Sequence, residues 1–519
     1  MDDQRTTVLC ALLAVILVAY TIRWRSDPLR SIPTVGGPSI PIWSYWSALN
    51  FLINARTLLT EGYKRYYGSA FKVALFDQWL VVVSGPKLVD DLRKRHDDEA
   101  SFTESVEEIL QTRYTWDREL IDDPYHLDII KDQLVRTPAA ALPDVFDELG
   151  SAIPEYIPAQ DNGMPIEVGT WIGLTLCAEE WVRVNIMQAS LKIVARASSR
   201  VFVGLPLCRN DDYLNLAIKF AVDIFKDLYI LGLAPACLKF YASRCFSAAR
   251  KTIRQSMTHI QPLLDERRAK MEMYGDDYPG KPKDMLQGIL EKAIPRRSPD
   301  SQITERIMSV NVAAIHTSSN GISHALLHLA AAPEYMQPLR EEAEGAITTD
   351  GWTKAAMDKM WKIDSFLKES QRVNGVSLTA MTRKAMKDIV LADGTFVPRG
   401  TLITAASYPT HHDEALYENA LVFDPFRYAR MRAAGGEGMK HQFVHTSVDN
   451  ISFGHGKHAC PGRFFAANEL KAMLAYIVLN YDLKLPTSGP RPENLYFGSN
   501  VIPPPVADIL FRRRRQIVG

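Results

Sequence analysis

The stretch SFGHGKHACPGRFFAANELKAMLAYIVLNY, residues 452–481, carries a glycine-rich loop through one cysteine into an amphipathic helix. Pro461 directly follows Cys460 and suits the first turn of a helix, where a missing N–H costs nothing. Cys460 is therefore expected beside a helix N-terminus, where free N–H groups and the positive end of the helix dipole favour a thiolate. A thiolate in this position is a candidate metal ligand.

The residues around Cys460 suit a flat macrocycle that carries iron. Gly456 and Gly462 lack Cβ atoms, so the backbone can turn tightly and approach a porphyrin closely. His458 offers a hydrogen-bonding group to a haem propionate, and Phe453 can shield the sulfur from water. A buried structural cysteine is the plainer alternative. The spacing F-x-x-G-x-[RH]-x-C-x-G favours haem, with Cys460 as the axial ligand of the iron.

This motif resembles the haem-binding loop of the cytochrome P-450 superfamily, and two segments upstream of it are similar to that family as well. IDSFLKESQRV, residues 363–373, places Glu369 and Arg372 on one helical face. An E-x-x-R pair alone is weak, because surface pairs at this spacing are common. FDPFRY, residues 423–428, resembles the family's F-x-P-x-R segment. The resemblance implies that Glu369, Arg372 and Arg427 form a structural ion-pair network that braces the haem-binding loop.

The resemblance also implies the fold: mainly α with small β-sheets, a triangular helical body around buried haem b. We expect residues 32–519 to form this catalytic domain. The segment FKVALFDQWLVVVSGP, residues 71–86, alternates well enough to predict a β-hairpin. The middle of the chain, residues 90–300, is mostly helical in pattern.

Residues 301–332 have helical periodicity and stop before Pro333, which predicts an unusually long helix. Its centre, AAIHTSSN, gathers small and polar residues that must be hydrogen-bonded if buried, as a core network or as a proton path. The family has small-Gly-x-acid-Thr here, so Thr317 matches the family threonine and His316 stands where the acid would be. We expect Thr317 to direct protons to oxygen, with His316 in the relay or beside it. A hydroxyl that only kinks the helix is the alternative for Thr317.

Residues 6–22 carry no charge and form a candidate transmembrane helix. Arg23, Arg25 and Arg30 follow them, so the positive-inside bias places the rest of the chain in the cytosol. We expect residues 1–31 to be an anchor in membrane lipid, with single-pass topology in the endoplasmic reticulum membrane. A cleaved signal peptide is the alternative, although the preceding residues are acidic and no A-x-A-like site follows.

The composition and motifs limit the binding partners and cofactors that the chain can have. Lys plus Arg and Asp plus Glu both number 60, so no global field favours nucleic acid. The six cysteines contain no C-x-x-C pair, which argues against a zinc or iron–sulfur module. The chain also has no Rossmann G-x-G-x-x-G after a strand. Electrons must therefore come from a separate NADPH-dependent cytochrome P-450 reductase, and a cytochrome b-type second donor is left open.

The implied reaction is insertion of one oxygen atom from O2 into a small molecule, because thiolate ligation favours O–O cleavage. The substrate cavity is expected between the long helix, residues 373–380 and residues 494–505, which are largely apolar. A terpenoid or steroid-like secondary metabolite suits this lining, and the run AAIHTSS resembles fungal ent-kaurene oxidase-like enzymes. A haem-thiolate isomerase, dehydratase or desaturase, or a non-enzymatic haem carrier or sensor, are the alternatives.

Overall fold

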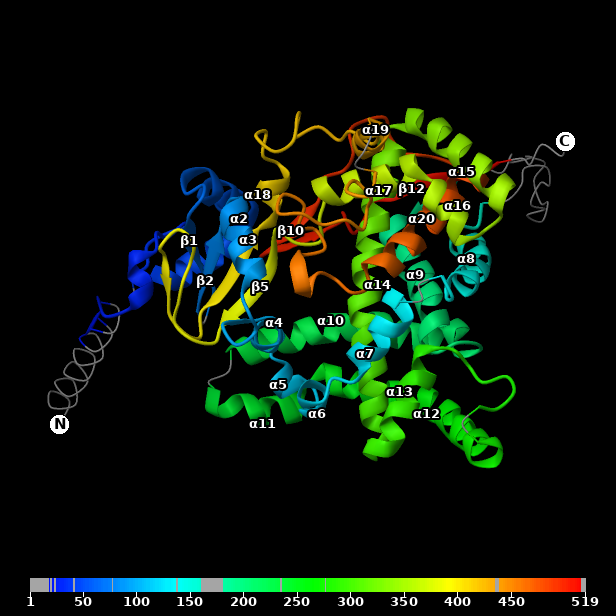
Figure 1. The fold of residues 1–519 in the computed structure, drawn as a ribbon, viewed down its shortest axis with the longest axis horizontal. Coiled ribbons are helices and arrows are strands. Elements are labelled where there is room, and N and C mark those ends of the chain that lie inside the picture. The colour runs from blue at the N-terminus through cyan, green and yellow to red at the C-terminus, as the bar shows by residue number, and fades with distance from the viewer. Residues whose placement is uncertain are drawn as a thin grey trace, which may run out of the picture.

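The structure, a computed structural model, describes residues 18, 21–22, 25–40, 43–76, 78–136, 139–159, 181–233, 236–275, 277–434 and 438–514. Within these residues helices dominate, and four small sheets accompany them. Figure 1 shows the sheet formed by β1, β2 and β5 in one lobe with α2 and α3, and most other helices gathered in a second, larger lobe. The predicted fold class, mainly α with small β-sheets, is therefore confirmed.

The helices have the following bounds: α2 Trp43–Arg65, α3 Pro86–Lys94, α4 Phe102–Leu110, α5 Thr112–Thr115, α6 Glu119–Asp122, α7 His126–Ile130, α8 Leu142–Tyr156, α9 Ile186–Phe202, α10 Asp211–Leu233, α11 Ala236–Phe246, α12 Ala248–Tyr274, α13 Met285–Arg296, α14 Asp300–Ala331, α15 Met336–Asp350, α16 Lys354–Lys359, α17 Trp361–Val373, α18 Ser407–His411, α19 Arg427–Ala433 and α20 Arg463–Asn480. Short 3-10 turns are η1 Pro28–Ser31, η3 Leu207–Arg209, η4 Pro333–Tyr335 and η5 Gly456–His458, and η2 Lys131–Arg136 is a π-helical turn.

The strands have the following bounds: β1 Ala70–Ala74, β2 Trp79–Val83, β3 Ala100–Ser101, β4 Val182–Asn185, β5 Thr379–Ala385, β6 Ile389–Val390, β7 Phe396–Val397, β8 Leu402–Ala406, β9 Tyr481–Lys484, β10 Leu495–Phe497, β11 Asn500–Ile502 and β12 Asp508–Arg513. The largest sheet has the order β1-β2-β8-β5-β3. β1 and β2 form the predicted hairpin, in antiparallel register from Ala70 opposite Val83 to Ala74 opposite Trp79. β2 then pairs with β8 in parallel.

The long helix α14 is the axis of the helical lobe, where Figure 1 shows it crossing from one side to the other beside α9 and α20. It begins after Pro299 and ends at Ala331, because Pro333 cannot extend it. α9, α10, α12, α17 and α20 all pack against it. Most of its side chains are consequently buried, including charged and polar ones.

A helix that could cross a bilayer is not found among the described residues. The predicted anchor, residues 6–22, lies outside them except for positions 18, 21 and 22. The predicted transmembrane helix is thus not part of the described structure, and the division at residue 31 stays a prediction.

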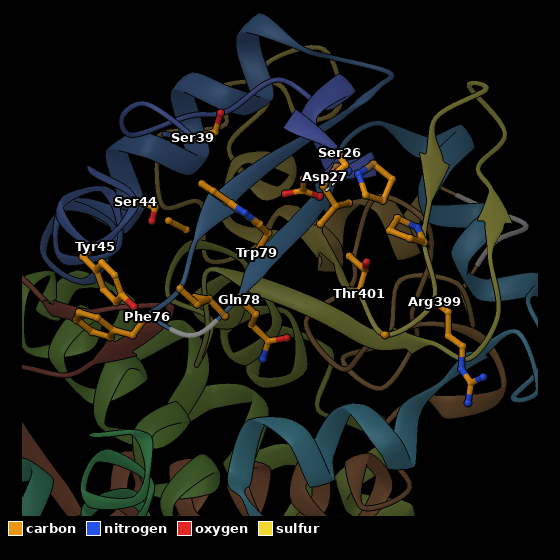
Figure 2. A pocket seen from close by; sticks show the side chains of 16 residues that line it. Ser26, Asp27, Ser39, Ser44, Tyr45, Phe76, Gln78, Trp79, Arg399 and Thr401 are labelled. Carbon is orange, nitrogen blue, oxygen red and sulfur yellow. Dashed lines mark hydrogen bonds between the residues drawn. The ribbon is translucent and has the colours of Figure 1, made fainter. Parts of the chain in front are cut away.

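A surface pocket of about 680 Å³ lies in the lobe of the largest sheet. Figure 2 shows it between η1, the turn before β2 and the turn before β8, with Trp79 and Thr401 on its walls. It is lined by none of the residues predicted for the functional site. The pocket is therefore separate from the predicted site.

Candidate active site

Cys460 lies in a closed loop between η5 and α20. Its N–H donates a 2.8 Å hydrogen bond to the carbonyl of Phe453, and the N–H of Gly454 donates to Ile451 at 2.8 Å. The Phe453 ring packs on Phe443, with centroids 5.4 Å apart. Cys460 is half-buried and forms no disulfide. The loop thus presents one unpaired thiol at the start of α20, as the sequence predicted.

The environment of this thiol combines opposing influences. Burial raises the pKa of Cys460, while the N–H groups of Gly462 and Arg463 and the Arg463 charge lower it. Arg463 also donates to the Cys460 carbonyl at 2.8 Å, which keeps its guanidinium beside the loop. A bound metal cation would add the charge needed to hold the sulfur as a thiolate.

Two loop glycines are needed for different reasons. Gly456 has φ +81°, and a Cβ there would stand 2.3 Å from the Cγ atom of Arg93 on α3. Any larger residue would be strained by the positive φ and would displace the Arg93 side chain. At Gly462, the nearest atom to an added Cβ would be the Cys460 sulfur at 4.0 Å. A side chain there would take up space beside the sulfur, so both glycines fit a loop that accepts a flat group.

His458 stands at the rim of the loop among groups that the sequence did not predict. Its Nε2 lies 2.6 Å from an Asp97 carboxylate oxygen, and its ring stacks on Phe102 with centroids 5.6 Å apart. Burial and the nearby Arg383 charge lower the pKa of His458. His458 is therefore held by Asp97, and the nearby Arg383 charge disfavours the protonated form of His458.

Arg383 lies on β5, and it was not predicted from the sequence as a residue of the site. It is 3% exposed, and its guanidinium carbon lies 5.4 Å from the Phe102 ring centroid. Its Nη1 donates to the carbonyl of Thr382 at 2.8 Å, burial lowers its pKa to about 10, and no ion pair with a carboxylate is found for it in the described part of the chain. A buried, unpaired guanidinium calls for an anion. The propionates of a haem held by Cys460 fit this requirement.

The centre of α14 carries an open stripe on an otherwise buried helix. Ala313 and Thr317 are exposed, and Gly321 one turn further is partly exposed. These positions follow one another at i, i+4, so they line a single face. The other residues of this segment are buried or half-buried, so the stripe is its most exposed face. Thr317, predicted to be the proton-directing hydroxyl, lies on this stripe.

The neighbouring His316 points elsewhere. Its Nε2 donates a 2.8 Å hydrogen bond to the carbonyl of Ile218 on α10, which fixes the proton on this nitrogen. Burial lowers the pKa of His316. The Thr317 hydroxyl donates to the carbonyl of Ala313 at 2.7 Å. The structure thus puts Thr317 on the open stripe and His316 against α10.

The three segments predicted to line the substrate cavity meet. The N–H of Leu378 donates to Ser499 at 2.7 Å, and that of Val501 donates to Val376 at 3.2 Å. The Asn320 side chain on α14 donates to the carbonyl of Val501 at 2.7 Å. The β10–β11 hairpin is therefore tied to both α14 and the segment after α17.

Glu369, Arg372 and Arg427 also lie together. The Glu369 and Arg372 side chains are both 0% exposed and pair at 2.7 Å, and Arg427 Nε reaches Glu369 at 3.2 Å. Arg372 further donates to the carbonyl of Ala420 at 2.8 Å, and the N–H of Asp424 donates to Glu369 at 3.1 Å. This network joins α17 to the segment between α18 and α19.

A mainly helical fold with small sheets and an unpaired cysteine before α20 is what a haem-thiolate enzyme requires, and comparison with known proteins identifies the family. The family model described as Cytochrome P450 matches residues 177–511. The chain is 45% identical over 97% of its length to cytochrome P450 monooxygenase 151 of Postia placenta, covering 98% of that protein. It is 43% identical to cytochrome P450 monooxygenase CYP512U6 of Ganoderma lucidum, over 99% of the chain and 97% of that protein. The ent-kaurene oxidase P450-4 of Gibberella fujikuroi is 30% identical, over 96% of each.

The chain belongs to the cytochrome P450 family, whose members are monooxygenases that use haem and electrons supplied by a reductase. The predicted family, enzyme class and cofactor are therefore confirmed.

Proposed function

We propose that this monooxygenase holds haem through the Cys460 thiolate and oxidises a hydrophobic small molecule of terpenoid or steroid-like type. The observation that carries the proposal is the unpaired Cys460 thiol at the start of α20, together with the unpaired Arg383 cation buried near the same loop. Cys460 would bind the iron, and Arg383 and His458 would bind the propionates. When bound, haem supplies the activation of O2.

The chain's own residues then handle the proton. The Thr317 hydroxyl faces the open stripe of α14 and can pass a proton while its own hydrogen bond to Ala313 opens. We place His316 beside this relay, because its bond to Ile218 fixes α14 against α10. Glu369, Arg372 and Arg427 would stabilise the segments that flank the cysteine loop without touching substrate.

The substrate class rests on the lining and on one relative. The segments that meet around α14 include Leu378, Val376 and Val501, and few charged groups. An apolar cavity with few polar anchors selects for a hydrocarbon skeleton. One relative is named as an ent-kaurene oxidase, and ent-kaurene is a terpenoid hydrocarbon. A hydrophobic terpenoid is therefore the substrate we propose.

We further propose an NADPH-dependent reductase that docks beside the cysteine loop, with a cytochrome b-type protein as an optional second donor. Lys457 is 72% exposed and pairs with Asp97 at 2.8 Å at the rim of the loop. Lys440 and Arg463, which flank the motif in the sequence, add positive charge. Residues 6–22 would anchor the chain in the endoplasmic reticulum membrane, with the catalytic domain in the cytosol.

Isotopically labelled oxygen tests the proposal. The purified chain, a P450 reductase and NADPH are incubated with ¹⁸O2 and a panel of terpenoids that includes ent-kaurene, and products are analysed by mass spectrometry. One labelled oxygen atom per product is expected. Product without label would indicate an isomerase, dehydratase or desaturase instead. Absence of the thiolate-type band in the reduced carbon-monoxide spectrum would overturn the ligand assignment.

A further inference from the structure

The loop that carries Cys460 is held at its start by a buried histidine that was not predicted for the site. His411 is the last residue of α18 and is 1% exposed. The N–H of Ile451 donates a 3.1 Å hydrogen bond to Nε2 of His411, although forty positions separate the two residues in the sequence. Ile451 is 0% exposed. His411 therefore supplies the acceptor that this buried N–H requires.

From Ile451 two further hydrogen bonds shape the turn that leads to the cysteine. The carbonyl of Ile451 accepts from the N–H of Gly454 at 2.8 Å, and the carbonyl of Phe453 accepts from the N–H of Cys460 at 2.8 Å. The Ile451 side chain packs in the apolar cluster that lies against the largest sheet. The position of Ile451 therefore sets where the turn that ends at Cys460 begins.

The backbone of His411 is fixed by the buried ion pair on α17. The Arg372 guanidinium donates to the carbonyl of His411, and it also pairs with Glu369. α18 packs against both α17 and α2. His411 thus connects the ion pair with the cysteine loop, because its carbonyl binds Arg372 and its ring binds Ile451.

The ring of His411 can accept this hydrogen bond only in its neutral form. A backbone N–H always donates, so Nε2 is unprotonated and the ring proton is on Nδ1. Burial and the nearby cationic groups of His412, Arg372 and Lys368 lower the pKa of His411 to about 3. The ring is therefore neutral around pH 7, and Nε2 remains an acceptor.

The adjacent His412 is bonded within its own helical turn. Its Nδ1 lies 2.8 Å from the carbonyl of Tyr408, and its ring stacks on the Tyr408 ring with centroids 3.9 Å apart. Two neighbouring histidines thus have different partners, and His412 offers a matched control for His411.

We propose that His411 is a positioning residue for the haem ligand, which holds the cysteine loop through the Ile451 N–H and so keeps the Cys460 sulfur at the iron. This inference rests on the proposed function, because the loop needs a defined position only if Cys460 ligates haem. Without the His411 acceptor, the buried Ile451 N–H must find another partner, and the turn from Ile451 to Cys460 shifts to provide one. Residues that orient a metal ligand in this way change metal binding or activity by about 10- to 100-fold when they are replaced.

The lifetime of the thiolate ligand in the purified, haem-bound enzyme tests this inference. His411→Leu replaces the acceptor with an apolar side chain of similar size. The thiolate-type band of its reduced carbon-monoxide complex should be lost at least about tenfold faster than in wild type at the same temperature. The iron–sulfur stretching band of the ferric enzyme, measured by resonance Raman spectroscopy, should shift as well. His411→Gln, whose Oε1 can take the place of Nε2, should restore both readouts.

Two variants control for effects outside the loop. His412→Leu removes the neighbouring ring and should keep the thiolate-type band as stable as in wild type. Asp227→Leu removes a side-chain acceptor at the start of α12, where Asp227 binds the N–H groups of Ala248 and Ala249 at 2.8 and 3.1 Å. It should lower the unfolding midpoint without moving the iron–sulfur band. If His411→Leu does not fold, His411→Met takes its place, because its thioether fills similar space and accepts only weakly.

The outcomes separate this inference from the proposed function. A wild-type enzyme without a thiolate-type band would overturn the proposed function and, with it, the reason for this role of His411. If wild type has the band and His411→Leu retains it for as long, only the positioning role is overturned. The same conclusion follows if His411→Leu and Asp227→Leu lose the band at the same rate, or if His411→Gln behaves like His411→Leu.

Discussion

The cysteine loop and the centre of α14 are both rich in informative residues, but they differ in what fixes their geometry. In the loop, the positive φ of Gly456 and the N–H groups at the start of α20 arise from residues adjacent in sequence. In α14, Thr317 and His316 are also adjacent, yet Thr317 lies on the exposed stripe whereas His316 is bonded to α10. The role of a residue in the cysteine loop therefore follows from local backbone geometry. The role of a residue in α14 follows from how that helix packs against its neighbours.

Replacing the sulfur is the strongest test of the loop side. Cys460→Ser should abolish the thiolate-type band of the reduced carbon-monoxide complex and all product formation, because an alcohol does not ligate iron as a thiolate does. The measurement is the carbon-monoxide difference spectrum of equal amounts of folded protein. Cys245→Ser, at an exposed and unpaired cysteine, should leave the spectrum as in wild type. A retained band in Cys460→Ser would remove the basis of the site.

The ion pair that supports the loop should matter far more than an exposed one. Arg372→Ala leaves the buried Glu369 carboxylate with only Arg427 and should lower the free energy of unfolding by about 3 to 5 kcal/mol. Urea denaturation measures this loss. The exposed helical pair of Lys270 and Glu266 provides the control, and Lys270→Ala should leave the midpoint unchanged. Equal midpoints for the two variants would contradict the bracing role.

Glu305, at the start of α14, should make the stability of the folded protein depend on pH, because its carboxyl group is buried. Glu305 accepts a hydrogen bond from the N–H of Asp117 at 2.8 Å, and burial raises its pKa from 4.5 to about 7. The protonated form then stabilises the folded state below pH 4.5, and this stability is lost as the pH rises through 7. Relative to wild type, Glu305→Gln should gain about 3 kcal/mol across this window, at about 1.4 kcal/mol per unit. If the stabilities of wild type and Glu305→Gln changed with pH in parallel, the raised pKa of Glu305 would be refuted.

A methyl group distinguishes a strained glycine from an ordinary one. Gly456→Ala should cost about 1 to 3 kcal/mol, because of the positive φ and the contact with Arg93. It should also lower haem retention, measured as absorbance per protein. At Gly150 in α8 an added Cβ meets nothing within 4 Å, so Gly150→Ala should be neutral or stabilising by up to about 1 kcal/mol. If both variants behave alike, the loop is not constrained as described.

The smallest effect is expected at the centre of α14. Thr317→Ala should reduce product formed per NADPH by about tenfold while NADPH consumption continues, since water replaces the hydroxyl only in part. Thr349→Ala removes a hydroxyl with the same bond to the carbonyl four residues earlier, on the exposed face of α15. That control should keep the coupling of wild type. Unchanged coupling in Thr317→Ala would argue that Thr317 only shapes the helix.

Much of the architecture was predictable because it is local. The β1–β2 hairpin follows from alternation, and the limits of α14 follow from periodicity and Pro333. The spacing of Glu369 and Arg372 at i, i+3 already placed them on one face of α17. The order of motifs along the chain was enough to indicate the family.

Other features had no pattern in the sequence. Arg383 is one arginine in a short strand. It stands out because it is buried without an ion-pair partner among the described residues, and burial is produced by segments far away in the chain. The position of Asp97 beside His458 is of the same kind, with more than three hundred residues between them.

The sequence by itself determined that a thiol precedes a helix in a turn that only glycine can make, and hence that iron ligation is possible at Cys460. Only the tertiary structure decided which side chains of α14 are exposed and which are bound to neighbouring helices. Backbone conformation is set by neighbouring residues, whereas exposure and desolvation depend on the whole packed chain.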